Sequence, residues 1–347
     1  MNYFLLQHPG HNRVYYDAAE NLALAELTLA TDRFSTEVTN ISVEELAGVR
    51  YLKLECASAL SETDLQIAAR LSFLFAMYQG VEVVDKVLLE PLLMEDHHYI
   101  DPKISSLLKY KGKTNELFTR MMINVGLLSS GFGYEEAIRL LDPVAGRGTT
   151  LYEAAVYGYD AYGIELDQKS VHEGQVFFKK FLQEERMKHL LNKRQISGSK
   201  KSQATHLQEF TYAKDKDEFK KPDGRRYLGL IQGETQGAHD YFKKASFHLI
   251  IGDLPYGVHH AHNTEKKGPS PSRNPKELLA ESIGEWKKVL YPGGVIVLAW
   301  NSNVASPKVI RELFEKAGLE VLDSEPYSMF VHQVDRAIKR DIVVVRR

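Results

Sequence analysis

Residues 141–167 read LDPVAGRGTTLYEAAVYGYDAYGIELD and contain the pattern that decides the fold. An apolar stretch ends at Asp142, glycines follow at 146 and 148, and a second apolar stretch ends at Glu165. Glycines at such a turn allow a tight strand-to-helix connection and a close approach of the backbone to a ligand. The stretch therefore predicts a strand, a glycine loop, a helix and a second strand.

The same alternation continues on both sides of this stretch. Helical spacing of apolar residues predicts helices over 115–130, 148–158, 168–191, 274–290 and 306–318. Short apolar runs predict strands over 137–144, 160–167, 227–233, 247–257, 293–300, 319–326 and 340–347. Helices and short apolar strands in alternation are typical of an α/β fold with a Rossmann-like, doubly wound sheet.

The residues before this body predict a separate small α+β domain. Strands are expected over 3–7 and 49–56 and helices over 17–30 and 61–78, the last opened by a capping box of Ser61 and Asp64. We expect an accessory domain over 1–95, a connector over 96–113 and a main domain over 114–347. An insertion at about 191–226, rich in Lys, Ser and Gln, interrupts the main domain.

The charge of the chain is uneven. The whole sequence has 44 Lys and Arg against 46 Asp and Glu, which alone argues against a nucleic-acid partner. Residues 1–100, however, hold 15 acidic and 6 basic residues, so the rest holds 31 acidic and 38 basic residues. An acidic front therefore conceals a basic body, which is compatible with a polyanionic substrate.

Composition excludes several classes of protein. The chain of 347 residues is 44% hydrophobic and 26% charged, as in soluble globular proteins of one or two domains. Its one cysteine excludes an internal disulfide and a multi-cysteine zinc site. The start does not read as a signal peptide, and no run approaches the ~18 apolar residues of a membrane span. We expect a cytoplasmic protein with no membrane partner and no metal.

The glycine loop indicates which nucleoside is bound. Glu165 follows Gly146 by 19 residues, where a carboxylate can accept the hydroxyls of a ribose. Leu151 stands where the third glycine of a dinucleotide fingerprint would fall, and the loop has no Lys of a phosphate-binding GK[ST] motif. Asp142 suits an ammonium group rather than a pyrophosphate. A nucleoside with a cationic amino-acid tail is S-adenosylmethionine.

On these residues the sequence resembles the class I methyltransferases that act on exocyclic amino groups of nucleic-acid bases. Their motif D-P-F-x-G-x-G-T is matched by residues 142–149, with Val144 in place of Phe. The resemblance covers about 114–347 and implies a class I methyltransferase fold that closes with a C-terminal hairpin. It implies that S-adenosylmethionine is bound by Thr114, Asn115, Asp142, Ala145, Gly146, Gly148, Thr149, Glu165 and Glu234.

A second motif, DLPYG at 253–257, directly follows the apolar strand FHLIIG. An exocyclic amine is a poor nucleophile because its lone pair is delocalised into the ring. The Asp253 carboxylate and the Leu254 carbonyl can accept its two hydrogens and favour a pyramidal nitrogen. Pro255 fixes the turn, and Tyr256 offers a face on which an extracted base stacks. These four residues are the expected catalytic group.

The form DLPYG is similar to that of the THUMP-associated tRNA guanine-N2 methyltransferases, and so are the stretches 3–27 and 330–347. This resemblance implies an RNA substrate, with guanine N2 in tRNA as the expected target. Two features depart from it. About 95 residues are too few for both the ferredoxin-like and the THUMP modules of full-length relatives, and the front is acidic.

Other functions stay open at this point. The runner-up is a DNA adenine-N6 or cytosine-N4 methyltransferase, although no target-recognition region of ~100 residues is evident. A protein-amide methyltransferase, a non-catalytic RNA-binding module and a nicotinamide oxidoreductase fit less well. Carbon-5 pyrimidine methylation needs a nucleophilic cysteine, and the one cysteine, Cys56, lies far upstream. Residues 1–95 are expected to mediate a homodimer or to bind a small activator protein.

Overall fold

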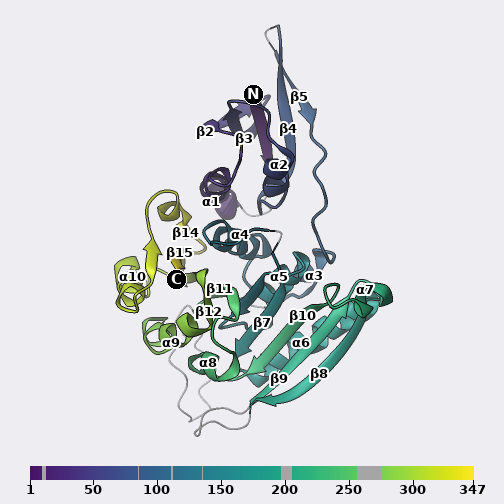
Figure 1. Cartoon of the computed structure of the whole chain (residues 1–347). Helices are drawn as coiled ribbons and strands as arrows, with labels where there is room; N and C mark the ends of the chain where they lie inside the picture. The colour runs from purple at the N-terminus through teal and green to yellow at the C-terminus, as the bar shows by residue number, and fades with distance from the viewer. Residues whose placement is uncertain (10–12, 85, 111, 135, 197–204, 256–274) are drawn as a thin grey trace. The chain divides into compact units, whose positions relative to one another are not determined.

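The structure is a computed structural model that describes residues 1–347 except 10–12, 85, 111, 135, 197–204 and 256–274, and only the backbone of 13–17 (Figure 1). Its internal contacts divide the chain into two compact units. The first unit comprises Met1–His97 and Asp323–Val334, and the second comprises His98–Leu322 and Asp335–Arg347. The domain boundaries expected from the sequence remain a prediction.

The first unit contains an antiparallel sheet with the strand order β2-β3-β1-β4-β5. Its elements are β1 (Asn2–Gln7), α1 (Arg13–Thr31), β2 (Val38–Leu46), β3 (Val49–Cys56), α2 (Glu62–Ala69), β4 (Leu74–Val83), β5 (Lys86–Pro91), η2 (Tyr327–Phe330) and β14 (His332–Gln333). Phe4, Leu52 and Leu27 lie in its buried core. The small α+β domain expected from the sequence is therefore present.

The capping box at the start of α2 is confirmed, but the expected length of that helix is wrong. The Ser61 side chain accepts from the Asp64 backbone N–H, and the Asp64 carboxylate accepts from the Ser61 backbone N–H. The helix was expected to reach residue 78 but ends at Ala69. The buried Glu26 carboxylate accepts the backbone N–H of Ser72 at 3.0 Å, which turns the chain into strand β4.

The second unit contains a sheet with the strand order β13-β15-β12-β11-β6-β7-β10-β9-β8. Its strands are β6 (Arg139–Asp142), β7 (Asp160–Glu165), β8 (Lys188–Ile196), β9 (Thr205–Ala213), β10 (Arg226–Gln232), β11 (Phe247–Asp253), β12 (Leu290–Asn301), β13 (Glu320–Leu322) and β15 (Lys339–Arg346). Its helices are α3 (Lys103–Leu107), α4 (Glu116–Leu128), α5 (Thr149–Val156), α6 (Gln168–Glu184), α7 (Lys216–Lys220), η1 (Thr235–Gly237), α8 (Ala238–Tyr241), α9 (Pro275–Val289) and α10 (Pro307–Lys316).

The central strands β12, β11, β6, β7 and β10 are parallel, whereas β15 is antiparallel to both β12 and β13. The chain fills one half of the sheet through β6, β7 and β10, and then crosses to β11 beside β6. This reversal of direction is the point at which open α/β sheets bind ligands. The expected fold class, a doubly wound α/β sheet that closes with an antiparallel hairpin, is confirmed.

Residues 188–213 contain two strands that were not expected from the sequence, β8 and β9. The helix expected over 168–191 ends at Glu184, because Arg186 adopts a positive φ of 55° and the Met187 N–H donates to the Leu182 carbonyl. Strands β8 and β9 then form an antiparallel hairpin that extends the sheet beyond β10. Phe178 on α6 packs against Phe210 on β9 with ring centroids 5.2 Å apart, which anchors the hairpin.

Candidate active site

Four acidic residues lie at or beyond the carboxyl ends of adjacent parallel strands in the second unit. Asp142 ends β6 and Asp253 ends β11, the two strands on either side of the reversal. Glu165 ends β7, and Glu234 lies two residues beyond β10, whose last residue pairs with Glu165. The sheet therefore gathers the acids of both sequence motifs along one edge.

The glycine loop between β6 and α5 is held against β7. The Ala145 N–H donates to the Ile164 carbonyl at 3.0 Å, and a Cβ on Gly163 would lie 2.6 Å from the Ala145 Cβ. Gly146 and Gly148 adopt positive φ values of 54° and 98°, which side chains disfavour. A Cβ on Gly146 would meet no atom within 4 Å, so the loop is open on that side.

Helices α5 and α6 fix the other side of the loop. The hydroxyl of the buried Tyr152 lies 2.8 Å from the Arg147 carbonyl and 3.0 Å from the Gly174 carbonyl. The Arg147 guanidinium pairs with Glu173 at 2.8 Å. Because Gly174 has no side chain, α6 approaches the loop so closely that a Cβ there would lie 2.8 Å from the Arg147 carbonyl. Both helices therefore hold the loop backbone in place.

Asp142 is almost completely buried beneath this loop. Its Oδ1 accepts the Val144 N–H at 2.9 Å. Burial raises the pKa of the Asp142 carboxyl to about 7, and the nearby charges of Glu165 and Asp253 act in the same direction. A hydrogen bond from Thr150 opposes this rise in pKa. A cation placed beside Asp142 would stabilise its ionised form.

Glu165 is oriented by backbone donors. Its Oε2 accepts the Gly146 N–H at 2.8 Å, and its Oε1 accepts the Asp167 N–H at 2.7 Å. The carboxylate thus lies beside the open part of the loop. Glu234 is exposed and precedes the short 3-10 helix η1. The positions of both acids are compatible with the predicted roles, which remain predictions.

Asp253 lies in a small network of side chains from three elements. Its Oδ2 accepts the Thr114 hydroxyl at 2.6 Å and lies 3.6 Å from Nη2 of Arg340 on β15. The Arg340 side chain is only 7% exposed, and its guanidinium lies over the Phe118 ring of α4 at 4.6 Å. The carboxylate is therefore held by a hydroxyl and faced by a largely buried cation.

Leu254 and Pro255, the next residues of the expected catalytic group, follow the end of β11, so the strand expected over 247–257 ends earlier, at Asp253. The Leu254 N–H donates to the Ala299 carbonyl of β12 at 2.8 Å, and the Leu254 side chain is buried. This bond fixes the peptide beside Asp253. Pro255 is exposed. Tyr256, the expected stacking residue, lies outside the described residues.

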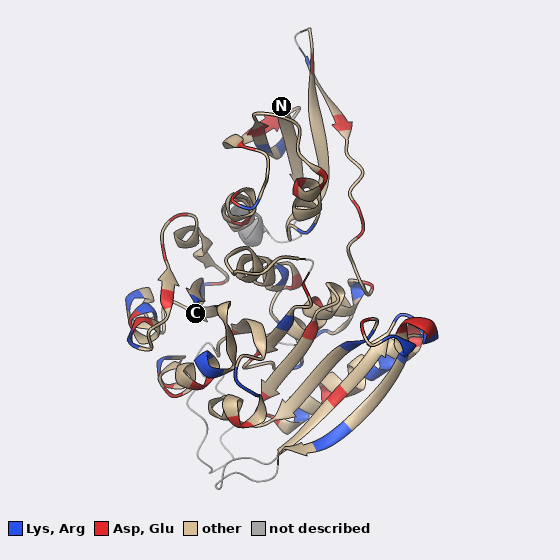
Figure 2. Ribbon diagram, in the orientation of Figure 1, with Lys and Arg blue, Asp and Glu red and all other residues tan. Residues whose placement is uncertain are grey.

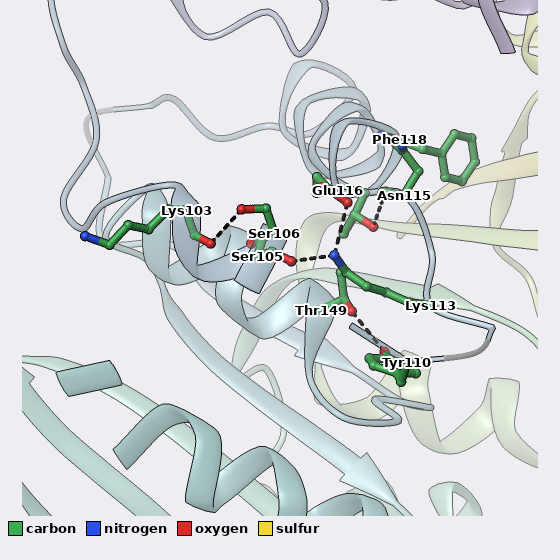
Figure 3. A network of polar contacts seen from close by, with 10 residues as sticks. Lys103, Ser105, Ser106, Tyr110, Lys113, Asn115, Glu116, Phe118 and Thr149 are labelled. Atoms are coloured by element: carbon green, nitrogen blue, oxygen red, sulfur yellow. Dashed lines mark hydrogen bonds and ion pairs between the residues drawn. The ribbon is translucent and has the colours of Figure 1, made fainter. Parts of the chain in front are cut away.

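The segment between α3 and α4 contacts residues of both motifs. Figure 3 shows Tyr110, whose hydroxyl lies 3.1 Å from Oγ1 of Thr149 at the start of α5. The Arg147 guanidinium lies 4.8 Å from the Tyr110 ring centroid. Asn115 caps α4 by accepting the Phe118 N–H at 3.1 Å. The Thr114 hydroxyl donates to Asp253 of the second motif. Thr114 and Asn115 thus both contact protein groups, and their binding of the cofactor remains a prediction.

Sequence reasoning did not identify Tyr110 or assign a role to Arg340. An aromatic residue between lysines, four positions before Thr114, was the available signal for Tyr110. Arg340 lies at the start of the expected last strand, and its neighbours in the sequence do not indicate a partner. Among the described residues, no cluster of three or more His, Cys, Asp or Glu could hold a metal ion. In the same residues, no helix is long and apolar enough to cross a membrane.

Comparison with solved structures finds proteins of similar fold, whereas comparison of sequences finds no match. No protein-family model matches the sequence, and no curated protein matches it. TrmN from Thermus thermophilus is a similar solved structure, at 12% identity over 100% of this chain and 99% of that chain, with a TM-score of 0.47. The T. thermophilus 16S rRNA N2 methyltransferase RsmC, in complex with AdoMet and guanosine, has 13% identity over 89% and 58% of the two chains and a TM-score of 0.37. Magnesium protoporphyrin IX methyltransferase from Synechocystis PCC 6803, with bound SAM, has 12% identity over 69% and 86% and a TM-score of 0.37.

Proposed function

We propose that this chain is an S-adenosylmethionine-dependent methyltransferase that acts on an exocyclic amino group of a base in RNA. One observation carries the proposal. Strands β6 and β11 are neighbours at the reversal of the sheet, so the D-P-V-A-G-R-G loop and the D-L-P segment lie at the same edge. A cofactor loop and an amine-binding carboxylate side by side are what amine methylation requires.

The residues of the loop suit S-adenosylmethionine. The open side of Gly146 leaves room for a nucleoside against the backbone formed by Ala145, Gly146, Gly148 and Thr149. Glu165 would accept the ribose hydroxyls, Glu234 would lie near the adenine amino group, and Asp142 would bind the ammonium group. When bound, the cofactor supplies an electrophilic methyl group on its sulfonium. Asp142 in its ionised form would offset part of the cofactor's positive charge.

Asp253 and Leu254 would hold the amine. The Asp253 carboxylate and the Leu254 carbonyl accept the two amine hydrogens and localise the nitrogen lone pair. The Thr114 hydroxyl would orient the carboxylate, and the Arg340 guanidinium would favour its charged form. Once the nitrogen carries a methyl group its proton is acidic, and the Asp253 carboxylate receives it. Catalysis of this kind rests on position and electrostatics rather than on a strong base.

The proposed target is guanine N2 in tRNA. The wording D-L-P-Y-G and its resemblance to tRNA guanine-N2 methyltransferases support this choice. The basic excess of residues 101–347 supports a polyanionic substrate, and Lys193 and Arg194 are exposed on the outer strand β8 (Figure 2). RNA phosphates bind to such basic surfaces in a salt-dependent manner.

Incubation with labelled S-adenosylmethionine and total tRNA, followed by nucleoside analysis, tests the proposal. We expect label in N2-methylguanosine and none in a matched DNA substrate. Label in DNA adenine or cytosine alone would instead support a DNA methyltransferase. In the variant Asp253→Ala, RNA binding should persist while methyl transfer falls by orders of magnitude. Equal transfer by this variant and the wild type would show that Asp253 is not the catalytic group.

A further inference from the structure

Strand β5 forms one edge of the sheet in the first unit, and this edge is suited to pairing with another strand. β5 is the last strand of its sheet and pairs with β4. Among the described residues, no strand pairs with its other edge. Natural proteins protect such edges with central charges, bulges or prolines, because an open edge is a template for another strand. In β5 the two charges and the proline lie at the ends of the strand, which leaves Val87, Leu88 and Leu89 at its centre without such protection.

The side chains of this hairpin form an exposed apolar surface. Val81 of β4 lies opposite Leu88 of β5, and Val83 lies opposite Lys86, so these residues share one face. Met77, on the same face of β4, is buried in the core of the unit. Farther along, Val81, Val83 and Leu88 are exposed, with Leu88 at 54%. The apolar face of the sheet therefore continues beyond the part that the unit itself covers.

We propose that β5 pairs antiparallel with β5 of a second copy of this chain, around a two-fold axis at Leu88. In that register Leu88 lies opposite the partner's Leu88, and Val87 lies opposite the partner's Leu89. Lys86 lies opposite the partner's Glu90, and the partner's Lys86 lies opposite Glu90. The two sheets join into one continuous sheet, whose central face carries Val81 and Leu88 from both copies.

The positions of the charged residues on β5 favour a second copy of this chain as the strand that pairs with its open edge. A two-fold axis requires opposite charges at equal distances from an apolar centre, and Lys86 and Glu90 lie two residues to either side of Leu88. All three side chains lie on the same face of β5. Among the described residues, neither Lys86 nor Glu90 forms an ion pair. Residues 1–100 carry a net negative charge, which disfavours unspecific self-association. The two Lys–Glu pairs would determine the register of the two β5 strands.

Charge exchange tests the proposal on the full chain. Sedimentation equilibrium should show a wild-type dimer that dissociates on dilution. Lys86→Glu and Glu90→Lys each place like charges opposite one another twice, and should raise the dissociation constant about tenfold. The double variant, with both exchanges, should restore the wild-type value. Glu82→Lys is the matched control, because it makes the same charge change as Glu90→Lys but lies on β4 opposite Val87.

A crosslink provides a second, independent measurement. Leu88→Cys would bring two thiols face to face across the axis, and mild oxidation should give a covalent dimer. Val49→Cys, exposed in the same unit but away from β5, should not crosslink, and the native Cys56 is buried. Circular dichroism confirms that each variant is folded. A wild-type monomer at all concentrations, single exchanges without effect, or no crosslink at Cys-substituted Leu88 would each overturn the proposal. None of these outcomes bears on methyl transfer.

Discussion

The Thr114 hydroxyl donates to Oδ2 of Asp253 across 2.6 Å, although 139 positions separate the two residues in the sequence. Thr114 precedes α4, and Asp253 ends a central strand of the sheet. The same segment contacts the glycine loop, because the Tyr110 hydroxyl lies 3.1 Å from Oγ1 of Thr149. One short segment therefore fixes the position of the proposed amine-binding carboxylate relative to the cofactor loop.

Thr114→Val should slow methyl transfer while the protein remains folded. The substitution keeps the shape of the side chain but removes the donor to Asp253. A hydrogen bond to a charged group contributes about 1.5–3 kcal/mol, so we expect a loss of about tenfold or more in the single-turnover rate. Thr114→Ser, which keeps the hydroxyl, should retain most of the rate. A wild-type rate in Thr114→Val would contradict the positioning role.

Arg340→Gln should lower kcat with little change in the affinity for S-adenosylmethionine. The Arg340 guanidinium is 3.6 Å from Asp253 and largely buried, so its loss leaves the carboxylate without the cation that favours its charged form. We expect a fall of about 10–100-fold, since a partly screened pair at this distance is worth a few kcal/mol. Arg340→Lys keeps the charge and should recover part of the rate. If Arg340→Gln and Arg340→Lys had equally reduced rates, the packing of Arg340 against Phe118, and not its charge, would be what supports methyl transfer.

The parts of the fold that the sequence predicted correctly are those determined by local patterns. Short apolar strands, the cap at Ser61 and the glycines at 146 and 148 are visible in the sequence because each acts over a few residues. The hairpin of β8 and β9 was missed because it depends on the contact between Phe178 and Phe210, which lie far apart in the sequence. The contact of Thr114 with Asp253 was missed for the same reason.

The binding of S-adenosylmethionine should weaken as the pH falls through about 7. Burial raises the pKa of Asp142 to about 7, so the carboxyl is largely neutral below that pH and cannot pair with an ammonium group. The dissociation constant should rise by up to about tenfold for each pH unit below this pKa. Calorimetry between about pH 5.5 and 8.5 measures this slope. In Asp142→Asn binding should be weak and nearly independent of pH, and an unchanged slope would contradict the assignment.

The same pKa shift makes a prediction about stability in the absence of ligand. A carboxyl whose folded-state pKa is raised contributes stability below its unfolded pKa, near 3.8 for Asp, and this contribution is lost as the pH rises through about 7. Asp142→Asn removes this dependence. Thermal unfolding should therefore show the variant gaining stability relative to wild type between about pH 5 and 7.5. A constant difference across this range would show that Asp142 does not titrate there.

Gly163→Ala should displace the glycine loop, because the added Cβ would lie 2.6 Å from the Ala145 Cβ and 2.9 Å from Cδ1 of Leu151. Ala145 cannot move freely, since its N–H is bound to the Ile164 carbonyl. Overpacking of this kind costs about 1–3 kcal/mol, so we expect a lower melting temperature and weaker binding of S-adenosylmethionine.

Gly284→Ala is the matched control for this change. Gly284 lies in helix α9, and a Cβ there would meet no atom within 4 Å. Alanine is favoured over glycine in a helix by about 1 kcal/mol, so the melting temperature should rise while the binding of S-adenosylmethionine stays the same. The two variants make the same chemical change with opposite expected effects on stability. If Gly163→Ala bound the cofactor as tightly as Gly284→Ala, the close approach of β7 to Ala145 would not be what holds the loop in place.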